Sequence, residues 1–133
     1  MTSKNFAYLG EGMVIHGGNG NDVIWANKGN NVLCGDAGKD RLVGASGDDI
    51  LDGGLGDDSL HGGGGNDTVR LCENWGHDTV EQLPGGKITL LLPANVKGTW
   101  NPVNMTFTSE DEENTVTVIG ISEQDVTITF EEE

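Results

Sequence analysis

Acidic and amide side chains recur at regular intervals along the first half of this chain. They stand nine residues apart, with one interval of eleven before the last: Asp22, Asn31, Asp40, Asp49, Asp58, Asp67 and Asp78. If the repeats stack on one another, these carboxylates come close together and repel unless a cation lies between them. Carboxylate and main-chain carbonyl oxygens are the ligands that hard divalent cations prefer. The spacing therefore predicts a ladder of cation-binding turns.

Glycine and one aliphatic residue recur with the same period. In blocks of nine that start at Gly17, with a two-residue slip before the last block, position four is always glycine: Gly20, Gly29, Gly38, Gly47, Gly56, Gly65 and Gly76. Position eight is always aliphatic: Ile24, Leu33, Leu42, Leu51, Leu60, Val69 and Val80. The first six positions are typical of a turn, because glycine allows positive φ and Asn and Asp favour turns. The aliphatic residue between two variable ones predicts a very short strand with one buried side chain.

These two elements define the expected architecture. A turn and a strand make half a coil, so two repeats complete one turn of a right-handed solenoid. Strands two repeats apart then stack in one sheet, and the position-eight side chains of the two sheets face each other inside. The predicted fold class is all-β, a parallel β-roll. Because this core is thin and the turns are rich in glycine, the block should not fold in water without a cation.

The repeat GGxGxDxUx resembles the repeats-in-toxin (RTX, haemolysin-type) family over residues 17–81. The resemblance implies a calcium β-roll that holds roughly four or five Ca²⁺ ions. On one edge it implies ions between Asp22 and Asp40, between Asp40 and Asp58, and between Asp58 and Asp78. An irregular loop with many carbonyls also suits the flexible coordination of Ca²⁺ better than the strict octahedron of Mg²⁺.

On the other edge the resemblance implies an ion between Asp49 and Asp67. A site at Asn31 is expected to be weak, because this block departs from the family pattern and lacks the charge. The last block lacks its leading glycines, which weakens its site as well. Turn carbonyls are expected to come from Gly17, Gly35, Gly44, Gly53 and Gly62.

The pattern changes after Pro84. Alternating apolar residues predict ordinary antiparallel strands over residues 87–92, 103–108, 115–120 and 125–130. Turns are expected at 109–114 and 121–124. A solenoid needs its open end covered. We therefore expect three parts. Residues 1–16 form a lead-in with the first rung, residues 17–81 form the nonapeptide roll, and residues 82–133 form a small antiparallel β cap. The last part resembles the β-rich flank that follows RTX repeats, and Trp75 and Trp100 are expected to pack within it.

Composition narrows the possible partners. The 22 acidic and 7 basic residues give a formal net charge of −15 and a pI near 4.2, which argues against nucleic acid and anionic membranes as partners. No apolar stretch approaches the roughly 18 residues of a membrane span. Residues 1–10 lack the apolar core of a signal peptide, and the family resemblance implies export by a type I secretion apparatus that reads an uncleaved C-terminal signal. We expect a secreted or cell-surface protein.

Histidine and cysteine offer a second kind of site. His16, Cys34 and Asp52 are predicted to lie in successive strands on the outer face of one sheet, where a transition metal could bind, although chance exposure explains them better. Cys34 and Cys72 should lie at least two strand spacings apart, about 9–10 Å, which is too far for a disulfide. We expect two free thiols.

The sequence favours a calcium-triggered folding module and offers no catalytic constellation. No serine, histidine and carboxylate can be assembled without borrowing calcium ligands, so we expect that the chain is not an enzyme. A second hypothesis is a binding or adhesion module that presents the roll or the cap to a glycan or a protein. A third hypothesis is the C-terminal module of a larger secreted toxin, protease or lipase.

Overall fold

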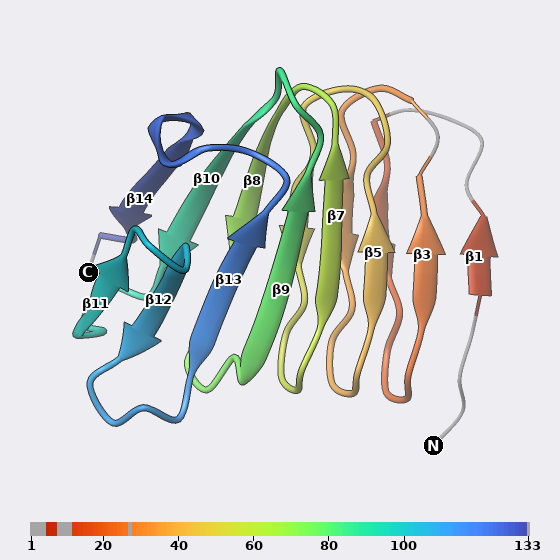
Figure 1. The fold of residues 1–133 in the computed structure, drawn as a ribbon. Coiled ribbons are helices and arrows are strands. Elements are labelled where there is room, and N and C mark those ends of the chain that lie inside the picture. Colours follow the sequence, from red (N-terminus) through yellow and green to blue (C-terminus); the bar gives the residue numbers. More distant parts are fainter. Residues whose placement is uncertain (1–4, 8–11, 27, 133) are drawn as a thin grey trace.

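Short strands alternate between two sheets along the chain. This computed structural model describes residues 5–7, 12–26 and 28–132, and the two sheets face each other as a roll (Figure 1). The first sheet begins with β1 (Asn5–Ala7), β3 (Val23–Trp25), β5 (Arg41–Val43), β7 (Ser59–Gly63) and β9 (His77–Gln82). The second sheet contains β2 (Val14–His16), β4 (Val32–Cys34), β6 (Ile50–Asp52) and β8 (Asn66–Arg70). Strands two repeats apart pair in parallel, which confirms the predicted β-roll.

The position-eight residue of each repeat strand fills the space between the sheets. The position-eight side chains are all 0% exposed: Ile24, Leu33, Leu42, Leu51, Leu60, Val69 and Val80. They lie in register, so that Leu42 stands between Ile24 and Leu60 in the first sheet. Within the repeats the hydrophobic core is therefore a narrow column with one aliphatic side chain from each strand. In the part of the chain that the structure describes, no helix has the length and apolar character needed to cross a membrane.

Much of the second half continues the roll, which corrects the prediction of an ordinary antiparallel cap. The strand β10 (Lys87–Leu92) pairs in parallel with β8, and β14 (Val126–Phe130) pairs in parallel with β10. In the first sheet β13 (Thr115–Ile119) pairs in parallel with β9. Alternation of apolar residues shows which face of a strand is buried, but it does not specify the direction of the neighbouring strand. That direction is set by the connection that returns the chain to the sheet, because a hairpin gives an antiparallel neighbour and a crossover gives a parallel one.

The antiparallel part is small and lies at one end of the first sheet. There β12 (Thr106–Ser109) pairs antiparallel with both β13 and β11 (Gly98–Asn101). The predicted strand at 103–108 therefore begins three residues later, and β11 was not predicted because it has no alternation of apolar residues. The predicted turn at 121–124 overlaps a short 3₁₀ helix, η1 (Glu123–Asp125).

Trp75 joins the last repeat to this end of the sheet. Its side chain is 1% exposed, its ring centroid lies 6.3 Å from that of Phe107, and its Nε1 donates to the carbonyl of Thr115 at 2.9 Å. Trp100 packs against the same core and is partly buried. Both tryptophans thus pack at the covered end of the roll, as predicted.

The position-four glycines are required by the way the turns stack. All seven have positive φ, from 82° at Gly29 to 116° at Gly38. A Cβ added at Gly38, Gly47, Gly56 or Gly65 would collide with the carbonyl oxygen of the position-four glycine two repeats earlier. Glycine therefore permits both the backbone conformation and the close approach of neighbouring turns.

Adjacent glycines provide a matched test of this requirement. Gly65 has φ of +89° and its added Cβ would meet the Gly47 carbonyl, whereas nothing lies within 4 Å of a Cβ at Gly64. We expect Gly65→Ala to lower the free energy of unfolding by roughly 1–3 kcal/mol, and Gly64→Ala to change it by less than about 1 kcal/mol. Urea unfolding at saturating calcium measures both. Equal losses in the two variants would contradict the stacking geometry.

Candidate calcium-binding turns

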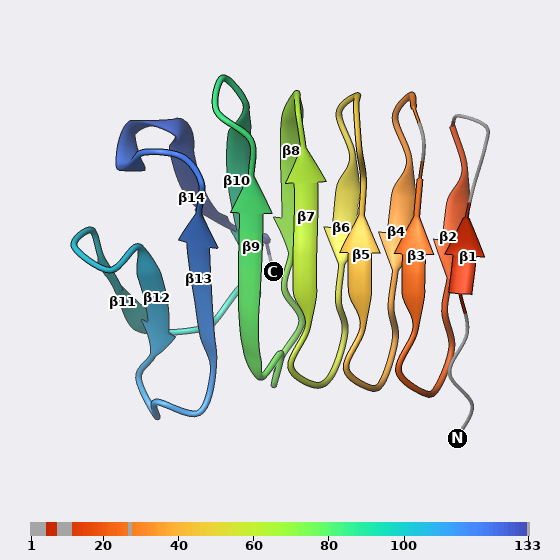
Figure 2. The ribbon, with the colours of Figure 1, turned by 45° about the vertical axis from the view of Figure 1, so that its right-hand side comes forward.

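The turns of alternate repeats gather at two opposite edges of the roll, as Figure 2 shows. We call the edge formed by the turns that precede β3, β5, β7 and β9 the odd edge. The edge formed by the turns that precede β4, β6 and β8 is the even edge. The position-six residues on the odd edge are Asp22, Asp40, Asp58 and Asp78. Those on the even edge are Asn31, Asp49 and Asp67. This is the grouping that the repeat predicted.

The position-six side chains are buried. Each of the seven is between 1% and 3% exposed, although six of them are carboxylates. A carboxylate out of contact with water needs donors or a cation to stabilise its charge. The partners of its two oxygens therefore decide what these turns can bind.

One oxygen of each carboxylate joins neighbouring turns. Asp40 Oδ1 accepts from the backbone N–H of Asp22 at 2.7 Å, and Asp58 Oδ1 accepts from that of Asp40 at 2.8 Å. The same bond links Asp58 to Asp78 at 2.8 Å and, on the even edge, Asp49 to Asp67 at 2.7 Å. From Asp40 onwards, one oxygen of each position-six carboxylate thus accepts the backbone N–H of the position-six residue two repeats before it.

The other oxygen has no donor at most positions. Among the described residues, the buried Oδ2 atoms of Asp40, Asp49, Asp58 and Asp78 have no hydrogen-bond partner. A buried anionic oxygen in this state is unstable unless a cation or a proton reaches it. A carboxylate oxygen in this state is a ligand that suits a hard cation.

The glycine that begins five of the seven blocks makes room beside this oxygen. A Cβ added at Gly35 would lie 2.5 Å from Asp40 Oδ2, and one added at Gly44 would lie 2.6 Å from Asp49 Oδ2. The corresponding contacts occur at Gly17, Gly53 and Gly62. These are the five glycines predicted to supply carbonyl ligands. That role stays a prediction, but the structure gives a second reason for glycine at this position.

Burial shifts the acidity of these groups. Burial is the main cause that raises the pKa of Asp40 and Asp49 to about 6 and that of Asp67 to about 7. It also raises the pKa of Asp78 to about 8 and that of Asp58 to about 9. Neighbouring carboxylates, such as Asp78 and Asp40 around Asp58, raise it further. Without metal, the folded turns therefore hold protons that a cation would displace.

A second ladder at position five was not predicted. Asn21 Oδ1 accepts from the backbone N–H of Lys39 at 2.8 Å, and Asp57 Oδ1 accepts from that of His77 at 2.9 Å. The even edge has the same bonds from Asn30 and Asp48. These bonds run from a turn to the next turn, opposite in direction to those of position six. The signal in the sequence is that position five is Asn or Asp in five of the seven blocks, namely Asn21, Asn30, Asp48, Asp57 and Asn66.

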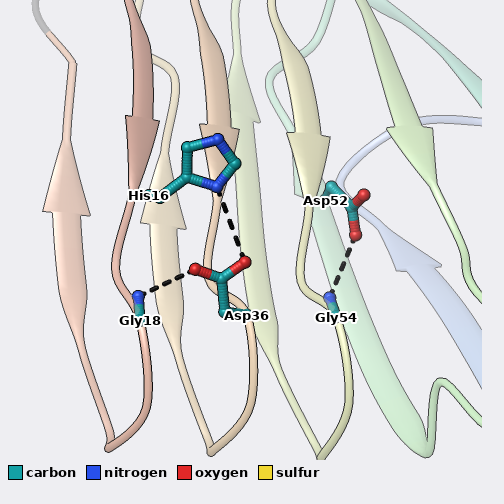
Figure 3. Close-up of polar contacts among 5 residues, drawn as sticks. All are labelled: His16, Gly18, Asp36, Asp52 and Gly54. Carbon is teal, nitrogen blue, oxygen red and sulfur yellow. Dashed lines mark hydrogen bonds and ion pairs between the residues drawn. The ribbon is translucent and has the colours of Figure 1, made fainter.

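The outer-face residues do not assemble a transition-metal site. His16, Cys34 and Asp52 do lie in register on neighbouring strands, as predicted. However, Figure 3 shows the His16 ring facing Asp36, with 3.6 Å between Nδ1 and Oδ1, while Asp52 accepts from the Gly54 N–H. Within residues 5–7, 12–26 and 28–132 no group of three or more His, Cys, Asp or Glu side chains could hold a metal ion.

Both cysteines are free thiols. Burial, with smaller contributions from the charges of Asp52 and Asp36, raises the pKa of Cys34 to about 11. Burial also raises the pKa of Cys72. Neither side chain is therefore a thiolate at neutral pH, which is the form that binds metals.

Comparison with known proteins identifies these turns. The family model for the RTX calcium-binding nonapeptide repeat matches residues 14–42 and 35–69, with four copies. Residues 14–69 are therefore similar to the RTX calcium-binding nonapeptide repeat, over a little less than half of the chain. Calcium is the cation that this repeat family binds. The repeat pattern and the roll geometry extend beyond the matched residues to Val80. A search of curated proteins found no match.

The raised pKa values predict how the metal-free roll responds to acid. The unfolded carboxyls have pKa values near 4, whereas those of the folded turns lie between about 6 and 9. The folded state therefore binds more protons, and its stability in chelator should rise as the pH falls from about 9 towards 4. Far-UV circular dichroism in chelator, at pH 5 and at pH 8, measures this as a larger folded fraction at pH 5. A metal-free chain that is less stable at pH 5 than at pH 8 would show that the carboxylates are not buried as described.

Proposed function

We propose that this chain is a calcium-triggered folding module of a protein that works outside the cell. The observation that carries the proposal is the set of buried Oδ2 atoms without a donor at Asp40, Asp49, Asp58 and Asp78. These oxygens are unfavourable in a folded roll without metal, and they become ligands when Ca²⁺ enters. Binding of calcium and folding of the turns are then one process.

At low calcium two forces keep such a chain extended. The stacked carboxylates repel, and the glycine-rich turns lose more conformational entropy on folding than other residues would. Calcium binds only the folded turns, so its binding free energy adds to the stability of the folded state. A thin core of one aliphatic side chain per repeat makes the roll depend on this contribution.

The proposed setting follows from the typical affinity of such sites. Extracellular calcium modules bind with Kd of about 10⁻⁴–10⁻³ M, so the chain would stay unfolded inside a cell and fold in a calcium-rich medium. RTX repeats are typical of secreted proteins. An extended chain is also the form that a type I secretion apparatus would export. In this proposal the module binds ions, catalyses no reaction, and acts alone or as part of a larger secreted protein.

Calcium titration followed by far-UV circular dichroism tests the proposal. We expect little β signal in chelator and a cooperative gain of β structure as calcium rises through the millimolar range. Magnesium at the same concentrations should give a much smaller gain, because it requires a strict octahedral site. A chain that already has full β structure in chelator and does not respond to calcium would overturn the proposal.

The ladder predicts that substitutions at different acidic positions shift the calcium midpoint of folding by different amounts. Asp58 stands between Asp40 and Asp78 and is expected to contribute to two ions, whereas Asp67 is the last carboxylate of its edge and contributes to one. The Asn variants keep an Oδ1 acceptor for the backbone bond but remove one charge. We expect Asp58→Asn to raise the calcium midpoint of folding more than Asp67→Asn.

Asp57→Asn is the matched control for this pair. Asp57 is exposed, and its backbone bond to His77 also survives as an amide. The control should shift the calcium midpoint least of the three. Equal midpoints for the Asp58 and Asp67 variants would argue against ions shared between neighbouring turns.

A further inference from the structure

The even edge of the roll ends without another carboxylate. In the parallel pair formed by β8 and β10, the residue opposite Asp67 is Ile88. The next turn along the even edge is the one that joins β9 to β10. It therefore supplies no acidic side chain at the position where the ladder would continue. Asp67 is nevertheless only 1% exposed. Because the side chain is buried, its Oδ2 atom needs a partner other than water.

Gln82 provides that partner. This residue ends β9, its side chain is 1% exposed, and its Nε2 donates to Asp67 Oδ2 at 2.8 Å. The same nitrogen donates to the carbonyl oxygens of Gly65 at 3.1 Å and Lys87 at 3.3 Å. Because all three neighbours are acceptors, only the NH₂ group of the amide satisfies them, which determines its orientation.

The surroundings of the Gln82 amide match a cation site in the types of ligand that they offer. One carboxylate oxygen and two main-chain carbonyls converge on a single positively polarised group, as they would on Ca²⁺. Glycine again makes the room, because a Cβ at Gly86 would lie 2.7 Å from Nε2 and one at Gly62 would collide with Oε1. Oε1 itself is buried and has no donor among the described residues.

A second amide closes the other end of the even edge. Asn31 holds the position-six place of its block, and its Oδ1 accepts from the Met13 N–H at 3.0 Å. Its Nδ2 donates to two carbonyls of its own turn, those of Lys28 at 3.1 Å and Gly29 at 3.3 Å. An N–H₂ group thus stands where a carboxylate oxygen stands in the other turns, and it pairs with carbonyls that a cation would use.

We propose that the carboxamides of Gln82 and Asn31 are built-in substitutes for calcium at the two ends of the even edge. This inference rests on the proposed function, because it concerns the same ladder of ions. Between the two amides the even edge keeps one Ca²⁺ site, formed by Asp49 and Asp67. On the odd edge the position-six residues are all carboxylates, so its sites lie between successive turns. The two edges therefore bind different numbers of ions.

Gln82→Glu tests the substitution directly. The variant replaces the NH₂ donor with an anionic oxygen beside Asp67 Oδ2 and the two carbonyls, which creates an all-oxygen site. We expect it to bind one more Ca²⁺ per chain than the unchanged protein, measured by isothermal titration calorimetry and equilibrium dialysis.

Gln124→Glu is the matched control, because it makes the same chemical change at an exposed residue of η1. It should leave the number of bound ions unchanged. If Gln82→Glu and Gln124→Glu bind the same number of ions as the unchanged protein, the inference is wrong. If the unchanged protein binds no calcium, the proposed function fails instead.

Asn31→Asp repeats the test at the other end of the edge. It should also add one ion, and the double variant with Gln82→Glu should add two. Asn95→Asp, at an exposed position, is its control. Should Gln82→Glu fail to fold, the Asn31 pair still decides the question, and an unchanged ion count in Asn31→Asp would overturn the inference for that end.

Discussion

Each turn of the roll is joined to the next through a buried carboxylate whose two oxygens have different partners. One oxygen accepts the backbone N–H of the preceding turn, so the carboxylate cannot rotate away from its neighbours. The other oxygen has no donor at four positions, and at three of these a glycine lies beside it. The bond that stacks the turns therefore also creates the need for a cation. This coupling explains why an acidic ladder can be part of a folded protein: charge repulsion is relieved in the same place where the turns meet.

Glycine and the aliphatic column are the other two conditions for this arrangement. Glycine at position four brings the turns close enough to stack, and glycine at position one leaves space for the second carboxylate oxygen. The aliphatic column keeps the two sheets in register but buries only one side chain per strand. Neither feature contributes much to the free energy of folding, because glycine loses much conformational entropy on folding and a narrow core buries little apolar surface. The stability of the roll therefore depends on what fills its edges.

The two edges are completed in different ways. The odd edge has a carboxylate in each of its repeat turns, and at its end Asp78 stands opposite the apolar Val116. The even edge begins with Asn31 and ends with the amide of Gln82 bonded to Asp67. An amide N–H₂ group is neutral, but its hydrogens carry a positive partial charge. It can therefore bond to the same oxygen atoms that a cation would contact. A chain can thus limit the number of ions that it binds without changing the path of its backbone.

The sequence by itself determined the repeat, the parallel roll and the identity of the position-six residues. These features follow from local rules, since a nine-residue period of glycine, acid and aliphatic side chain specifies where the chain turns and which residue is buried. The tertiary structure alone decided that β10, β13 and β14 continue the roll in parallel, because strand direction depends on how the connection returns the chain to the sheet and not on the pattern within the strand. It alone also decided the partner of each carboxylate oxygen. Gln82 is fifteen residues from Asp67 and outside the repeat, so no spacing rule connects the two, and only folding brings them together.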